Sequence, residues 1–170
     1  EVSIWYKVTN CNESRALEKT DFRAICGQFA TGITVITTSH NNKNIGFTAN
    51  SFTSVSLEPP VILFCLKTDS ASNQAFQQSK AFVINILSDA QEDVSNAFAN
   101  PKNTQEERFN AVSLQPNSLP VLQDSLGYLL GDIIDFKEVG DHIVYYGQVT
   151  DGAKTAGNPL LYAKGGYQRL

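Results

Sequence analysis

The chain has 170 residues, 42% of them hydrophobic and 10% aromatic, which is enough to fill the core of one domain and excludes wholesale disorder. A net charge of -4 at pH 7, with scattered lysines and arginines, argues against a nucleic-acid partner. The longest apolar run, Val61–Leu66, is far shorter than the ~20 residues of a membrane-spanning helix. The first residues do not resemble a secretory signal, so we expect no membrane association.

The three cysteines, Cys11, Cys26 and Cys65, have no CxxC spacing, and any disulfide would leave one of them unpaired. This favours a reducing, cytoplasmic location. Cys26 and Cys65 stand in apolar surroundings and are expected to be small core residues. His40 and His142 lie too far apart for a zinc motif, so no metal site is predicted.

Residues 1–19 are interpreted as an N-terminal arm, and residues 20–170 as a single domain. Thr20 or Asp21 is a plausible helix cap. Apolar side chains at helical spacing then predict a helix that ends at Gly32: Phe22, Ile25, Cys26 and Phe29.

The rest of the domain predicts mostly strands, because runs of β-branched and aromatic residues alternate with turn residues. Short helices are expected over 73–78 and from the capping box of Ser88 to Asn100, and a polar loop over 102–118. The strands are expected at 33–38, 45–56, 61–67, 81–87, about 126–138, 142–151 and within 158–167. This pattern predicts a mainly β (α+β) fold, an antiparallel split β-barrel of six to seven strands, Greek-key type, with short flanking helices.

The segment from Gly46 to Pro60 consists largely of small hydroxyl and amide side chains and leads directly into Val61–Leu66. Small side chains let a flat ligand approach the backbone, so this segment could be the bed of a planar heteroaromatic cofactor. From composition alone, a serine- and threonine-rich edge strand is the commoner explanation.

Several single residues are candidates for ligand contacts, each with a plainer alternative. Ser70 and Ser72, near Lys67, could hold a phosphate, or one of them could simply cap a helix. Asn85 interrupts an apolar strand and could meet a ligand or satisfy the backbone. His142, next to Asp141 at a strand start, could face a pocket or lie half-exposed in a turn, and Arg108 could reach a cofactor phosphate or belong to a solvated charge cluster.

Six motifs in order resemble the short-chain flavin reductase family, over about residues 21 to 167. They are 29–38 (FATGITVITT), 46–57 (GFTANSFTSVSL), 59–66, 82–87 (FVINIL), 140–142 (GDH) and 166–167. The family's usual Asp-Arg-Phe reads Glu107-Arg108-Phe109 here.

The resemblance implies FMN or FAD at a homodimer interface, reduced by NADH or NADPH. His142 would contact the nicotinamide, Asn85 the ribityl chain, and Ser70 and Ser72 the phosphate, while Tyr167 would close the pocket. Ile33 and Thr34 would meet the pyrimidine side of the ring. The remaining residues that the resemblance assigns to the cofactor are Thr48, Ala49, Asn50, Ser51, Ser54, Cys65, Lys67, Arg108 and Asp141.

The resemblance therefore implies an NAD(P)H:flavin oxidoreductase that supplies reduced flavin to a partner monooxygenase. An FMN-binding electron carrier similar to flavoredoxin is the main alternative. An enzyme like pyridoxamine-phosphate oxidase, or a flavin- or haem-sensing module on a related split barrel, is a third. His142 beside Gly140 favours the reductase, because a pure carrier has no need of a nicotinamide site.

Overall fold

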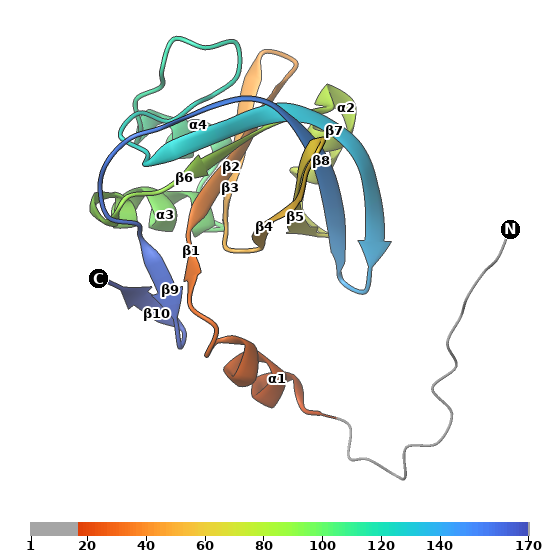
Figure 1. The fold of residues 1–170 in the computed structure, drawn as a ribbon, viewed down its shortest axis with the longest axis vertical. Helices are drawn as coiled ribbons and strands as arrows, with labels where there is room; N and C mark the ends of the chain where they lie inside the picture. Colours follow the sequence, from red (N-terminus) through yellow and green to blue (C-terminus); the bar gives the residue numbers. More distant parts are fainter. Residues whose placement is uncertain (1–16, 170) are drawn as a thin grey trace, which may run out of the picture.

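A seven-stranded antiparallel sheet, in the order β3-β2-β6-β7-β8-β5-β4, forms the body of the protein in a computed structural model that describes residues 17–169 (Figure 1). Its strands are β2 (Thr34–His40), β3 (Lys43–Ala49), β4 (Phe52–Leu57), β5 (Pro60–Lys67), β6 (Ala81–Ile86), β7 (Gly127–Val139) and β8 (His142–Lys154). The long hairpin β7–β8 curves around one side of the molecule (Figure 1). The predicted fold class is confirmed.

A second, three-stranded sheet and the helices flank this body. The small sheet contains β1 (Thr31–Gly32), β9 (Leu161–Ala163) and β10 (Gly166–Gln168). The helices are α1 (Lys19–Cys26), α2 (Asn73–Ser79), the 3-10 turn η1 (Asp89–Gln91), α3 (Glu92–Ala99) and α4 (Gln105–Asn110). No helix within residues 17–169 is long and apolar enough to cross a membrane.

Two apolar clusters hold the layers together. Strand β5 shows how the sheet forms the first cluster, because its side chains alternate: Ile62, Phe64 and Leu66 are buried while their neighbours are half-exposed. The second cluster lies on the side of α3 and includes Phe98, which packs edge-on against Phe109 of α4 at a ring-centroid distance of 5.1 Å. The two clusters therefore cover the two faces of β2, with Ile36 in the first and Val35 in the second.

The structure corrects the prediction at the first helix. Helix α1 ends at Cys26, well before Gly32, because the backbone N–H of Gly27 closes the last turn onto Arg23. None of its residues is buried, so Cys26 is exposed and not part of the core. The predicted apolar stripe exists, but Phe22, Ile25 and Phe29 are 58%, 61% and 79% exposed.

Two further segments differ from the prediction. The segment 45–56, predicted as one strand, is divided into β3 and β4 by a break at Asn50 and Ser51. The predicted polar loop over 102–118 contains helix α4, which starts with a capping box between Thr104 and Glu107. The capping box predicted at Ser88 is confirmed, and it begins η1, which leads into α3.

Candidate functional site

A cavity of about 890 Å³ opens between the ends of β3 and β5 and the segments that carry α2, α3 and α4. Its size lies within the usual range for cofactor sites, roughly 300–1,000 Å³. The predicted site residues that line it are Thr48, Ser51, Cys65, Lys67, Ser70, Ser72, Arg108 and His142. Segments far apart in the sequence thus meet at one place.

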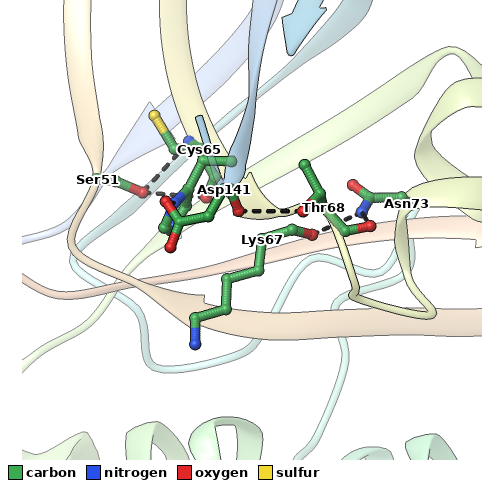
Figure 2. A network of polar contacts seen from close by, with 7 residues as sticks. Ser51, Cys65, Lys67, Thr68, Asn73 and Asp141 are labelled. Atoms are coloured by element: carbon green, nitrogen blue, oxygen red, sulfur yellow. Dashed lines mark hydrogen bonds and ion pairs between the residues drawn. The ribbon is translucent and has the colours of Figure 1, made fainter. Parts of the chain in front are cut away.

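The floor of the cavity is fixed where β4 begins beside β5. The Ser51 hydroxyl donates to the Cys65 carbonyl oxygen at 3.1 Å and accepts from the Cys65 backbone N–H at 3.2 Å (Figure 2). The Ser51 side chain therefore satisfies both backbone groups of Cys65, as a paired strand residue would, just before β4 starts. Burial raises the pKa of the Cys65 thiol, so the floor is a neutral surface near pH 7.

Hydrogen bonds to backbone carbonyl oxygens join the end of β5 to the β7–β8 turn and to α2 (Figure 2). The Asn73 side-chain amide donates to the carbonyl oxygens of Lys67 and Thr68, at 2.7 and 3.1 Å. The Thr68 backbone N–H donates to the Asp141 carbonyl oxygen at 3.0 Å. The Lys67 side chain makes none of these contacts and extends away from the network in Figure 2. Its ammonium group is therefore free to meet a ligand.

Ser70 and Ser72 lie on the turn between β5 and α2. The Ser70 hydroxyl oxygen accepts from the Ser72 backbone N–H at 3.3 Å, and no side-chain bond caps α2. Simple capping by Ser72, the plainer alternative, is not what the geometry shows. Ser72 is buried, with only 7% of its surface exposed. Ser70 and Lys67 therefore offer the more accessible polar atoms.

His142 reaches the cavity because the β7–β8 turn has two residues, Gly140 and Asp141. Gly140 has φ of +62°, a conformation that glycine adopts without strain in tight hairpin turns. The register places His142 opposite Lys67. Its ring nitrogen Nδ1 lies 2.8 Å from the Asp141 carboxylate, and this hydrogen bond lowers the pKa of that exposed carboxyl group. Asp141 thus orients the imidazole from outside the cavity and does not line it.

Helix α4 supplies the wall facing Thr48, and it is attached to a single residue of β3. The Gly46 backbone N–H donates to Oε1 of Gln105 at 2.8 Å, and Nη1 of Arg108 donates to the Gly46 carbonyl oxygen at 2.7 Å. Nη2 of Arg108 also donates to the Asn100 carbonyl oxygen at 3.0 Å. A Cβ at Gly46 would lie 2.8 Å from the Phe98 ring, so the close approach of these layers requires glycine.

The sequence prediction missed most of this wall. Gln105 stands in the segment interpreted as loop, and nothing in its neighbours marks it as a lining residue. The capping motif of Thr104 and Glu107 was the available signal for α4. The other cavity-lining residues that were not predicted include Phe47, Phe98, Pro101 and Asn103.

The structure corrects the prediction that Asn85 meets the ribityl chain. Asn85 is fully buried, and its amide donates to the Val35 carbonyl oxygen and the Thr37 hydroxyl, at 3.0 and 3.2 Å. Its Oδ1 accepts from the Leu122 backbone N–H at 2.8 Å. These bonds satisfy the amide inside the protein, so the plainer alternative describes Asn85.

Three more predicted residues belong to the core rather than to the cavity lining. Ile33 and Thr34 are 4% and 3% exposed, and the Thr34 hydroxyl donates to the Ala49 carbonyl oxygen at 2.7 Å. The Ala49 side chain packs against the first apolar cluster. Ile33 belongs to the second apolar cluster, and none of the three residues lines the cavity.

The last predicted residues lie at other places on the surface. Asn50 lines a second hollow of about 540 Å³, together with Phe22 and Tyr162 among others. Ser54 is exposed on β4. The Tyr167 hydroxyl is hydrogen-bonded to Ser95 and Asn96 of α3, at 2.8 and 3.0 Å, so Tyr167 does not line the main cavity.

The arrangement fits an anionic, phosphorylated ligand with a flat ring. The lining combines small polar side chains with two cations, Lys67 and Arg108, against one carboxylate, Asp69. Charge-assisted bonds from such cations are the usual way to hold a phosphate. A histidine at the rim and a neutral floor complete a site that can orient an aromatic ring beside a second ligand.

Known proteins resemble this chain over nearly its whole length. The flavin reductase like domain matches residues 26–170. A probable flavin reductase of Rhizobium meliloti is 45% identical over 144 residues, which are 83% of this chain and 45% of that protein, so the chain spans less than half the length of this relative. The reductase subunit HsaB of a flavin-dependent monooxygenase from Mycobacterium tuberculosis is 36% identical, over 91% of this chain and 83% of that protein.

A solved structure gives the same result for the fold. Flavin reductase PheA2 in its native state superimposes with a TM-score of 0.82 at 36% identity, covering 90% of this chain and 98% of that chain. The likeness therefore extends over the large sheet and the segments that form the cavity.

Proposed function

The chain belongs to the flavin reductase like domain family, and we propose that it is an NAD(P)H:flavin oxidoreductase that supplies reduced flavin to a separate monooxygenase. The observation that carries this proposal is the meeting of His142, the Ser51–Cys65 floor and the Lys67–Ser70 turn in one cavity. Flavin and nicotinamide supply the hydride chemistry when both are bound, so the protein needs no obligatory acid or base.

The residues of the cavity then have distinct tasks. Ser51, Cys65 and Thr48 form the surface against which the flavin ring lies, and Lys67 with Ser70 and Ser72 holds the phosphate. His142 contacts the nicotinamide and is kept in place by Asp141. Holding the two rings face to face is the main contribution of such a site to the rate.

The homodimer implied by the resemblance is also part of the proposal. Large apolar side chains are exposed on three elements: Phe22 and Ile25 of α1, Val55 and Leu57 of β4, and Ile134, Phe136 and Val139 of β7. Apolar surface of this kind is typical of protein interfaces. Light scattering after size exclusion should give twice the monomer mass at micromolar concentration, and a monomer would refute this part.

The free thiols of Cys26 and Cys65 support a cytoplasmic location.

A turnover assay tests the proposed activity directly. The purified protein is mixed with NADH or NADPH and an excess of FMN, FAD or riboflavin, and absorbance at the nicotinamide band is followed. Many turnovers without another protein are expected. Tightly bound flavin that neither nicotinamide nucleotide can reduce would refute the reductase and support the flavoredoxin-like carrier.

The supply of a partner requires a second assay. Reduced flavin released into solution should support a flavin-dependent monooxygenase that is separated from the reductase by a dialysis membrane. Retention of the reduced flavin on the protein would contradict this role while leaving the reductase activity intact.

A further inference from the structure

We propose that the cavity is built for a flavin dinucleotide, FAD, whose two phosphates lie between Lys67 on one wall and Arg108 on the other. This rests on the proposed function and specifies its substrate. FMN carries one phosphate, and the wall of Lys67, Ser70 and Ser72 would be sufficient for it. A mononucleotide would leave the α4 wall without a phosphate to bind.

The charges on the two walls are the first support. Within residues 17–169, neither Lys67 nor Arg108 lies within 4.0 Å of a carboxylate, since the one such pair is Asp141 with His142. The molecule as a whole is acidic, with a net charge of -4, so two cations against the single carboxylate of Asp69 in the cavity lining reverse the local sign. Charge of one sign concentrated in a cleft favours a ligand of the opposite sign.

Arg108 makes the stronger case of the two, because it is partly buried. Its described partners are the carbonyl oxygens of Gly46 and Asn100, which carry no formal charge. Burial without a counter-ion lowers its pKa. A guanidinium group held in this way is compensated only when an anion enters the cavity, and phosphate is the anion that arginine binds with the best geometry.

The α4 wall is also held rigidly in place before any ligand arrives. Gln105 and Arg108 together engage both backbone groups of Gly46. The carboxylate of Glu107 accepts from the Thr104 backbone N–H at 2.7 Å, which lowers the pKa of this exposed acid and ties it to the helix start. Glu107 does not line the cavity, so it does not cancel the charge of Arg108. A preformed wall binds a ligand without a further ordering cost.

Equilibrium fluorescence titrations of the full chain with riboflavin, FMN and FAD, without NAD(P)H, test the inference. FAD is expected to bind at least about tenfold more tightly than FMN, because its second phosphate gains a charge-assisted bond. Equal affinities for FMN and FAD would overturn the proposal even if both are reduced, whereas no turnover with any flavin would refute the proposed function instead.

Two variants locate the effect on the α4 wall. Arg108→Gln should weaken FAD binding about 10- to 100-fold and FMN binding by no more than about threefold. Gln105→Glu keeps an oxygen that can accept from Gly46 N–H but adds a negative charge, so it should weaken FAD selectively even if Arg108→Gln unfolds. Lys102→Gln is the matched control, because it removes a positive charge from the same segment outside the cavity lining.

The nicotinamide nucleotide also contains a diphosphate. The same two variants show which of the two ligands, FAD or the nicotinamide nucleotide, the α4 wall binds. If Arg108→Gln and Gln105→Glu raise KM for NADH but leave the ratio of FAD to FMN affinity unchanged, the α4 wall serves the nicotinamide nucleotide and the proposal is wrong. If both variants weaken riboflavin, FMN and FAD equally, the wall has only a structural role, and the proposal is again wrong.

Discussion

Asn85 is a fully buried polar residue and Arg108 a partly buried one, and their surroundings differ in kind. The Asn85 amide makes all its hydrogen bonds with the protein: its NH2 group has two acceptors, and its oxygen has one donor. Arg108 has carbonyl partners but no carboxylate to balance its charge. The comparison teaches that a buried polar residue indicates a ligand site only where the protein leaves its charge or bonds unmatched.

The largest effect that tests this comparison is on stability, at Asn85. Asn85→Leu keeps the volume but leaves the buried Leu122 N–H without its partner, so the free energy of unfolding should fall by about 2–4 kcal/mol. Urea unfolding measures this change, and Asn158→Leu, at an exposed amide, should change it by less than about 0.5 kcal/mol. A loss of flavin affinity with unchanged stability would return Asn85 to the site.

The second effect is on catalysis, at His142. His142→Ala should lower kcat/KM for the nicotinamide nucleotide by about 5- to 150-fold while the flavin dissociation constant changes by less than about threefold. Steady-state rates at varied NADH and NADPH provide the measurement. His40→Ala is the matched control, since His40 ends β2 outside the cavity. A change within twofold in His142→Ala would remove this residue from the nicotinamide site.

A third effect concerns the Cys65 thiol of the floor. Because burial raises its pKa, less thiolate is present at a given pH than for an exposed thiol, and alkylation should be about tenfold slower at pH 8 than at Cys26. The rate should rise as the pH approaches the raised pKa. Mass spectrometry after iodoacetamide treatment gives both rates. Bound FMN should slow Cys65 further and leave Cys26 unchanged; protection of both or neither would place the flavin elsewhere.

The smallest effect is expected at Lys67, which is exposed and therefore well screened by solvent. Lys67→Ala should weaken FMN binding about 3- to 10-fold and leave riboflavin, which has no phosphate, within about twofold. Fluorescence titration at low and high salt measures both constants, and Lys137→Ala, outside the cavity, is the control. Equal losses for FMN and riboflavin would show that Lys67 contacts the ring or only supports the turn.

The sequence was sufficient for the class of fold because it depends on local patterns. The β-branched run at Thr34–Thr38 and the alternation in Val61–Leu66 correspond to β2 and β5. Several residues that line the cavity were also predicted, among them Ser51, Lys67 and His142, which stand at or next to strand ends.

The failures have a common physical origin. Asn85, Thr34 and Ala49 belong to β6, β2 and β3, and the direction of their side chains depends on which face of each strand the neighbouring layers cover. A single sequence does not contain that information. Gln105 was missed because its role arises from Gly46, 59 residues away along the chain. The exposed stripe of α1 was read as a buried face because spacing alone cannot distinguish a core from a surface that awaits a partner.

The attachment of α4 to Gly46 has a further consequence for how copies of this chain can associate. The strands β3 and β4 are the two edges of the large sheet. On β3, Gln105 and Arg108 occupy the backbone groups of Gly46 that a foreign strand would need. On β4, the register shift between Ser54 and Ser56 disturbs the pairing, while Val55 and Leu57 stay exposed. One edge is thus closed by the chain itself, and edge-to-edge association is directed to the other.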